Sequence, residues 1–388
     1  MTGIPDAGSA FELKPAQRML AETVYELSRR HVAPRAAEID ENNEYPEDVF
    51  QLLKSHDLLG LYVPEAYGGA GLGILETCVA IEQMARLCSN SPLFFSVHLL
   101  ATRPIAIGGS EAQKRTYLTG VARGDLRPAF ALTEPHAGSD AANISTRAER
   151  DGDSWLINGA KCYCTGSSVA DFITVAAKTE PDKGARGISF FIVPRGEFRV
   201  GRHERKMGMR GIPTCEVFLE NARVPLENMI GEQDLGFKTA MLGFNQARPA
   251  IGARGVGLAQ GCLDYASQYA REREAFGKPI ARLQAVQFML ADMFMETEAA
   301  RLLVYRAAAM VDNGRYRKEH VHFICAAKCY ATDAAMKAAV DGVQVLGGAG
   351  YMKDHPLERF MRDAKQLQII EGTNQIQRMV IAQNILSL

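Results

Sequence analysis

The stretch Ile188-Ser189-Phe190-Phe191-Ile192-Val193 decides the fold, because it is strand-like and lies in the middle of the chain. Other short, β-rich runs lie at residues 154–157, 172–175 and 216–219. Asp151-Gly152 before the first of them is a strong hairpin signal. No helical pattern separates the runs. We therefore predict a mainly antiparallel, barrel-like β domain over residues 127–236, not a doubly wound parallel sheet.

Helical patterns lie on both sides of this region. In residues 1–126, apolar side chains recur at 3.6-residue spacing in the segments 17–30, 46–55 and 75–87. In residues 237–388, long helical patterns run over 251–273, 283–313 and 320 to about 346. Long helices side by side indicate a four-helix bundle. The sequence therefore predicts an α+β protein with an N-terminal helical domain, a middle β domain and a C-terminal bundle.

Composition excludes several function classes. The 388 residues carry a net charge of −1, so no global basic field favours nucleic acid or a membrane surface. No apolar run is long enough to span a bilayer. The polar segment Met1 to Ala10 reads as a frayed tail and not as a signal peptide. Eight scattered cysteines suit free thiols in a reducing compartment, so we expect a cytoplasmic protein.

Two glycine runs and one His/Cys cluster invite other interpretations. Gly69-Ala70-Gly71-Leu72-Gly73 and Gly255-Val256-Gly257 resemble dinucleotide loops, but neither follows a predicted strand. His320, His322, Cys325 and Cys329 fall at near-helical spacing and could ligate a metal. Because both cysteines share the apolar face of their helix, packing is the better interpretation, and we expect no metal site.

Two further pairs have structural interpretations that we prefer to functional ones. Cys162 and Cys164 alternate along a predicted strand and could be redox-active, but packing on one face is favoured. Arg362 and Asp363 could act as a functional pair, and a structural ion pair near a helix end is the better default.

Five motifs in order resemble those of the acyl-CoA dehydrogenases. The segment 130–140, Phe-Ala-Leu-Thr-Glu-Pro-His-Ala-Gly-Ser-Asp, is similar to the signature loop of that family. Further similar segments are Asn158-Gly159-Ala160-Lys161 with Thr165, residues 272–278, residues 344–348 and residues 371–378. The resemblance covers nearly the whole chain, and the family has the α-β-α architecture predicted above. It implies a flavoenzyme that desaturates acyl-CoA thioesters between the α and β carbons.

The resemblance makes Glu371 the catalytic base. Such a base must accept a weakly acidic α-proton, and an apolar pocket raises the pKa of a glutamate toward neutrality. Ile369 and Ile370 supply apolar neighbours. A helix-capping glutamate is the alternative interpretation. In branched-chain and long-chain relatives the base lies on the long helix, where this chain has Ala247, which cannot take a proton.

The same resemblance implies FAD as the cofactor. The isoalloxazine ring is expected against Phe130, Leu132, Thr133, Tyr163, Cys164 and Thr165, and Ser139 is a further expected cofactor contact. The family usually has Trp where this chain has Tyr163. The remainder of FAD is expected across a subunit interface, at Arg273, Phe276, Gln284, Gln344, Gly347, Gly348, Thr373 and Gln375. Shared sites imply a homo-oligomer, and we expect a tetramer built as a dimer of dimers.

Substrate-binding residues follow from the same motifs. Ser139 and Arg248 are candidates for binding the CoA arm. Gly372 is expected to let the thioester approach closely. Asn245 is a further candidate, at a position where the family often has Asp or Glu. The C-terminal half resembles the medium- and short-chain enzymes, which implies substrates with medium or short acyl chains. The same resemblance implies a role in fatty acid β-oxidation and lipid metabolism, with electron-transfer flavoprotein as the electron acceptor. Acyl-CoA oxidases, enoyl-CoA reductases and carrier-protein desaturases share the fold. A non-catalytic scaffold without flavin is the rival of another class.

Overall fold

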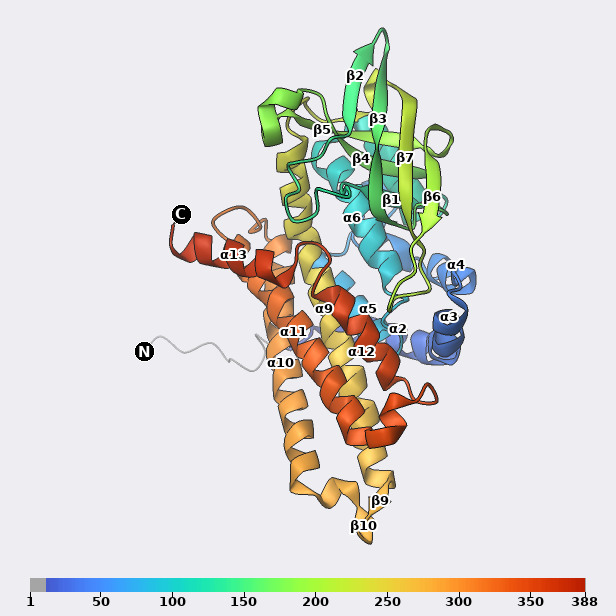
Figure 1. Cartoon of the computed structure of the whole chain (residues 1–388), viewed down its shortest axis with the longest axis vertical. Coiled ribbons are helices and arrows are strands. Elements are labelled where there is room, and N and C mark those ends of the chain that lie inside the picture. The colour runs from blue at the N-terminus through green and yellow to red at the C-terminus, as the bar shows by residue number, and fades with distance from the viewer. Residues whose placement is uncertain (1–11, 388) are drawn as a thin grey trace.

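The computed structural model describes residues 12–387, and the predicted tail at Met1 to Ala10 lies outside them. Within these residues, helices lie on both sides of a sheet in the order of the chain, which confirms the predicted α+β class (Figure 1). The N-terminal helices are α2 (Pro15–Leu27), α3 (Ala36–Asn42), α4 (Glu47–Ser55), α5 (Ile74–Ala85), α6 (Leu93–Gly108), α7 (Glu111–Gln113) and α8 (Thr119–Ala122).

Eight strands form one sheet in the order β6-β7-β3-β2-β4-β5-β8, with β1 paired in parallel to β4. The strands are β1 (Pro128–Ala131), β2 (Arg147–Asp151), β3 (Ser154–Thr165), β4 (Phe172–Lys178), β5 (Ile188–Pro194), β6 (Arg199–His203), β7 (Thr214–Pro225) and β8 (Met229–Ile230). The predicted hairpin joins β2 to β3, where Asp151 pairs with Ser154. Most neighbouring pairs are antiparallel, as predicted.

Alternation of side chains explains why β5 is apolar throughout. Phe191 and Val193 point into a core that the sheet encloses by itself, together with Trp155 and Val217. Phe190 and Ile192, on the opposite face, pack into the core of the helical domains. A strand covered on both faces carries no polar stripe, and β5 is such a strand.

The C-terminal part is built on one very long helix. It contains α9 (Gly236–Glu272), the hairpin β9 (Glu274–Ala275) and β10 (Lys278–Pro279), α10 (Gln284–Asp312), α11 (Val321–Leu346), α12 (Leu357–Leu367) and α13 (Asn374–Ile385). The helix predicted from residue 251 begins fifteen residues earlier, at Gly236. Gly243 and Pro249 weaken the local helical signal, and packing of α9 against α6 overrides it.

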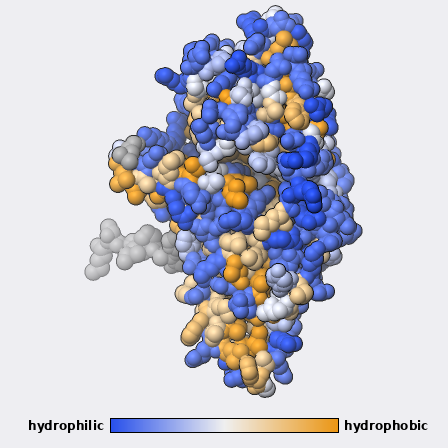
Figure 2. Space-filling view, in the orientation of Figure 1, coloured by the Kyte–Doolittle hydropathy of each residue, from blue (hydrophilic) through white to orange (hydrophobic). Residues whose placement is uncertain are grey.

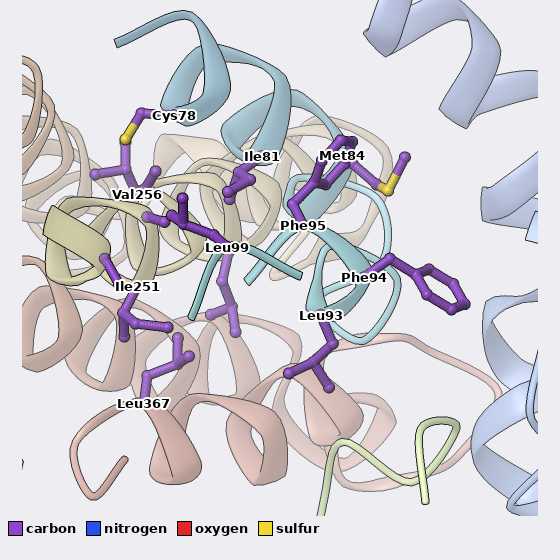
Figure 3. Close-up of a cluster of buried hydrophobic side chains, with 14 of the residues drawn as sticks. Cys78, Ile81, Met84, Leu93, Phe94, Phe95, Leu99, Ile251, Val256 and Leu367 are labelled. Carbon is purple, nitrogen blue, oxygen red and sulfur yellow. The ribbon is translucent and has the colours of Figure 1, made fainter. Parts of the chain in front are cut away.

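Helix α9 also packs against α5, α10 and α11, so it joins the N-terminal and C-terminal helices in one core. Figure 3 shows part of this core, with Leu99 of α6, Ile251 of α9 and Leu367 of α12. A Cβ atom at Gly257 would lie 2.2 Å from the backbone oxygen of Glu82 in α5. The glycines of the run 255–257 therefore permit close helix packing and do not form a dinucleotide loop.

The expected pairing of Arg362 with Asp363 is wrong. Arg362 instead bonds Asp40 (2.7 Å) and Glu358 (2.7 Å), while Asp363 accepts a hydrogen bond from the Met209 backbone N–H at 2.5 Å. Adjacent residues of a helix point in different directions, so their side chains find separate partners. Within the described residues, all eight cysteines are unpaired and buried, and no helix is long and apolar enough to cross a membrane.

A buried ion pair fixes the segment that follows β1. The Lys161 ammonium lies 2.8 Å from the Glu134 carboxylate, and both side chains are almost fully buried. Glu134 also accepts hydrogen bonds from the backbone and hydroxyl groups of Ser145 and Thr146. Burial raises the pKa of Glu134, but the charge and hydrogen bond of Lys161 and these further donors outweigh it and hold the pKa at about 2.

Lys161→Met should destabilise the protein strongly, because it leaves a buried carboxylate without its partner. Losing one member of a buried pair typically costs about 3–5 kcal/mol. The thermal midpoint should fall by several degrees, and the double variant Lys161→Met/Glu134→Leu should recover much of that loss. Lys183→Met removes an exposed pair with Asp234 and serves as the control. Equal midpoints for the two lysine variants would contradict a structural role for the buried pair.

Candidate active site

The predicted base lies in the turn between α12 and α13. Glu371 (φ 52°) and Gly372 (φ 91°) are both left-handed, and Thr373 begins α13 by accepting a hydrogen bond from the Ile376 N–H at 3.2 Å. A Cβ atom at Gly372 would lie 2.7 Å from the amide nitrogen of Gln377. Non-glycine residues adopt such a backbone at a cost, and it persists where surrounding contacts hold it.

Four hydrogen bonds to two backbone oxygens hold this turn. The Gly372 oxygen accepts from Lys328 Nζ at 3.0 Å and from Gln377 Nε2 at 2.9 Å. The Glu371 oxygen accepts from Gln377 Nε2 at 3.2 Å and from Arg248 Nε at 3.4 Å. Helices α9, α11 and α13 therefore each donate to the turn, and its conformation depends on all three.

Asn374 connects the turn to α11. Its side-chain oxygen accepts from Lys328 Nζ at 2.9 Å, and its amide nitrogen donates to Asp333 at 2.7 Å and to the Cys329 backbone oxygen at 3.3 Å. Lys328 and Asn374 are both buried. Cys329, considered above as a metal ligand, thus packs against this connection. Among the described residues, no group of His, Cys, Asp and Glu side chains could hold a metal ion.

The Glu371 side chain has the properties of a base. Its Oε2 atom is buried and has no hydrogen-bond partner. Burial raises the pKa of Glu371 to about 7, against the opposing charges of Arg248, Lys328 and Arg254. A carboxylate that is half ionised near neutrality and lacks other partners can accept a proton from a bound molecule.

Arg248 and Asn245 lie beside the base on α9, and both are buried. Arg248 donates to the Asn245 side-chain oxygen at 2.8 Å and to the Cys325 sulfur at 3.4 Å. The Asn245 amide donates in turn to the Tyr316 backbone oxygen at 2.9 Å. Both polar ends of Asn245 are therefore engaged within the protein, and one of them accepts a hydrogen bond from Arg248.

The residues expected at the flavin ring gather where β1 and β3 meet. The Thr133 backbone oxygen accepts from the Cys162 N–H at 2.9 Å, and the Thr165 and Thr214 hydroxyls are 3.3 Å apart. A bulge between Lys161 and Cys164 interrupts the strict alternation of β3. At this bulge Tyr163 is left-handed and 65% exposed. An exposed flat ring and nearby hydroxyls fit an aromatic cofactor with a polar edge.

Other residues of the expected ring site have different surroundings. Phe130 packs between Phe190 (5.6 Å) and Phe244 of α9 (5.8 Å), which places the end of β1 one helical turn from Arg248. Leu132 is buried, Ser139 is exposed, and Cys164 contributes to the core inside the sheet. Only the backbone of Cys164 is thus placed to contact a ligand outside the sheet.

The residues expected at the far half of the cofactor lie elsewhere. Six of them are exposed: Arg273, Phe276, Gln284, Gln344, Gly347 and Gly348. They occupy the end of the helical part opposite the sheet, around β9 and β10 (Figure 1). Gln375 is exposed at the start of α13, beside Thr373. One chain therefore does not bring this group together with the ring-side residues.

Sequence reasoning missed Lys328 and Asn374 as part of this site. A signal was available for Lys328, because it recurs with Cys325, Cys329 and Thr332 at helical spacing on a buried face of α11. A charged residue on such a face needs buried partners. Asn374 lies inside a quoted motif, but nothing local distinguishes it from a surface amide.

Glu371→Gln should stabilise the folded protein in a pH-dependent way. A folded-state pKa of about 7, above the ordinary value of 4.5, means that wild-type stability falls as pH rises between those values. The neutral amide escapes this loss, which amounts to up to about 3 kcal/mol. The midpoint of the variant should match wild type near pH 4.5 and exceed it at pH 8. Glu149→Gln, at an exposed position of β2, should show no such trend, and a trend equal in both variants would refute the assignment.

Comparison with known protein families matches all three parts of the chain. The N-terminal domain of acyl-CoA dehydrogenases matches residues 14–125, the middle domain matches residues 129–222, and the C-terminal domain matches residues 234–386. These are the regions that contribute α2 to α8, most of the sheet, and the helices that hold Glu371.

Individual relatives align over nearly the whole chain. The probable acyl-CoA dehydrogenase FadE25 of Mycobacterium tuberculosis is 46% identical over 379 residues, which cover 97% of each chain. Cyclohex-1-ene-1-carbonyl-CoA dehydrogenase of Syntrophus aciditrophicus is 45% identical, with 97% of this chain and 91% of that protein covered. The structure of butyryl-CoA dehydrogenase from Megasphaera elsdenii superposes with a TM-score of 0.94, at 36% identity and over 97% and 99% of the two chains. The chain therefore belongs to the acyl-CoA dehydrogenase family, whose members are FAD-dependent oxidoreductases that act on CH–CH bonds.

Proposed function

We propose that Glu371 removes the α-proton of an acyl-CoA thioester. The observation that carries this proposal is the buried, unpartnered Oε2 atom of a carboxyl whose pKa is about 7. FAD, when bound, supplies the acceptor for the hydride that leaves the β-carbon, so one proton and one hydride leave as the double bond forms. The geometry of the turn fixes where Glu371 can reach.

Positive charge around the turn makes the proton transfer possible near neutral pH. Arg248, Lys328 and Arg254 oppose the effect of burial and keep a useful fraction of Glu371 ionised. Once Glu371 holds the proton it is neutral, and its burial no longer opposes the product state. No competing base exists at the alternative position on α9, because Ala247 is buried and has no titratable group.

The flavin residues support a site shared between subunits. Thr133, Tyr163 and Thr165 would hold the ring, and the exposed group around Arg273 and Gln344 would receive the dinucleotide end from a second copy of the chain. The remaining proposed FAD contacts are Phe130, Leu132, Ser139, Cys164, Phe276, Gln284, Gly347, Gly348, Thr373 and Gln375. We propose a tetramer arranged as a dimer of dimers.

Exposed apolar side chains support this assembly. They gather over the lower part of the helices in Figure 2. Phe276 is 89% exposed, and Phe288 and Met295 of α10 are 64% and 58% exposed. Large apolar side chains in such a group are typical of surfaces that pack against another subunit.

The substrate proposal is a short- or medium-chain acyl group, with Ser139, Asn245, Arg248 and Gly372 on the thioester and CoA side. Two of the relatives described above have names that specify a substrate, and both substrates are small acyl groups: one is cyclic and the other is four carbons long. We further propose a cytoplasmic enzyme of fatty acid β-oxidation, with electron-transfer flavoprotein as acceptor.

Anaerobic flavin bleaching tests the reaction directly. Wild-type holoenzyme should bleach with short- or medium-chain acyl-CoAs, whereas Glu371→Gln should keep its yellow flavin and bleach at least about 10²-fold more slowly, as expected for a lost general base. Glu149→Gln should behave as wild type. Near-normal bleaching by Glu371→Gln would remove it from the reaction, and a colourless wild-type protein would remove the flavin. In air, rapid peroxide formation would indicate an oxidase instead of a dehydrogenase.

Lys328→Met should move the pH dependence of flavin bleaching to higher pH. Lys328 carries a positive charge at neutral pH that lowers the pKa of Glu371 and also holds the Gly372 oxygen. Without it, Glu371 should accept protons more readily, and the acid limb of kcat/KM should move to higher pH. Lys337→Met changes an exposed lysine of the same helix and is the matched control. An acid limb that stays in place would show that Lys328 does not act on the base.

A further inference from the structure

Arg254 is the largest fully buried side chain among the described residues, and its hydrogen bonding is incomplete. Its Nη2 atom donates to the Ser89 backbone oxygen at 3.4 Å and to the Met209 sulfur at 3.1 Å. Its Nε and Nη1 atoms are buried without a partner. Within the described residues, no carboxylate oxygen comes within 4.0 Å of this guanidinium.

Such an arrangement is costly for the folded protein. Burial lowers the pKa of Arg254 to about 10, against the opposing charges of Asp363 and Glu371, so the side chain stays protonated at neutral pH. Buried donors in proteins are nearly always satisfied, and exceptions call for an explanation. An acceptor from a bound molecule would satisfy at least one of the free nitrogens and balance the charge.

The position of Arg254 on α9 relates it to the reaction. Ala247, Ile251 and Arg254 follow one another at helical spacing and share one face. Arg254 is about 10 Å along the helix from Ala247, and its Cβ leans back toward that end. Glu371 and Asp363 are the carboxyl groups whose charges act on it, and Asp363 already binds the Met209 N–H.

Apolar side chains occupy the intervening turn of α9. Ile251 is fully buried and lies in the cluster with Leu99 and Leu367 (Figure 3). A chain extending from Glu371 along this face would thus meet an apolar stretch first and a cation at its far end. This order of environments matches an acyl group with methylenes in the middle and an oxygen anion at its terminus.

We propose that Arg254 binds the distal end of the acyl group, and that the preferred substrates are acyl-CoA thioesters whose chains end in a carboxylate. This inference rests on the proposed dehydrogenation at Glu371. A plain alkyl end would lie against a desolvated, unpaired cation, whereas a carboxylate supplies a hydrogen-bond acceptor and the opposite charge. Sites built around buried polar groups reject ligands that lack the matching group more strongly than apolar pockets reject extra atoms.

Matched thioesters test the proposal on the wild-type holoenzyme. The ω-carboxy and unsubstituted acyl-CoAs of four, five, six and eight carbons are compared by kcat/KM and by anaerobic bleaching. At the best length, the carboxylate form should be favoured by at least about 30-fold, as expected for a buried, hydrogen-bonded charge pair. A terminal amide of the same length distinguishes a neutral acceptor from an anion. Equal rates for the amide and the carboxylate would overturn the requirement for charge.

Arg254 variants provide the second test. Arg254→Met should reverse the preference, so that the ratio of kcat/KM for the carboxylate series to that for the alkyl series falls strongly, and Arg254→Lys should keep part of the wild-type preference. Because Arg254 also lowers the pKa of Glu371, the ratios are compared at a pH above the acid limb of each enzyme. Arg199→Met, at an exposed position of β6, should change neither series. If Arg254→Met does not fold, the wild-type comparison and Arg254→Lys still decide the matter.

The outcomes separate the two proposals. If wild type prefers the alkyl thioesters, and Arg254→Met does not change the carboxylate-to-alkyl ratio of kcat/KM, the inference is overturned and the dehydrogenase assignment stays intact. Weaker flavin binding by Arg254→Met, with an unchanged carboxylate-to-alkyl ratio once excess FAD is added, would assign Arg254 to the cofactor and would also overturn the inference. Absence of bleaching with every thioester would contradict the proposed function itself.

Discussion

The burial of one carboxyl group on a left-handed turn is the constraint on which the rest of the site depends. Glu371 is held in that backbone conformation by donors from α9, α11 and α13 that all reach its own or the next carbonyl oxygen. The same packing that supplies these donors buries the Oε2 atom of the side chain. Position and basicity of Glu371 therefore have a common origin in the packing of three helices.

The long helix α9 accounts for much of this arrangement. Its glycines let α5 approach closely, its Arg248 reaches the turn, and Phe244 meets Phe130 at the end of the sheet. The sheet contributes in turn a bulge that exposes Tyr163 and a loop fixed by the Glu134–Lys161 pair. A base on the helical side and a ring-binding edge on the sheet side are thus connected through one helix.

The sequence predicts what depends on local periodicity and leaves out what depends on distant partners. The β2–β3 hairpin and the apolar β5 were predictable, because turn residues and side-chain alternation are local signals. The start of α9 was not, since Gly243 and Pro249 mask a helix that tertiary packing stabilises. Glu371 was identified by resemblance, but its surroundings were not: Lys328 lies 44 residues from Gly372 in the chain. The unsatisfied Arg254 is likewise visible only when its neighbours are placed.

The central claim is that folding moves the ionisation of Glu371 to neutral pH. Infrared difference spectra of wild type against Glu371→Gln isolate the carboxyl band of this residue, and following that band across pH measures its pKa in the folded enzyme without substrate. Half-ionisation near pH 7 is the result that the structure predicts. Half-ionisation near 4.5, the ordinary value for a glutamate, would show that the turn does not bury the carboxyl and would contradict the account.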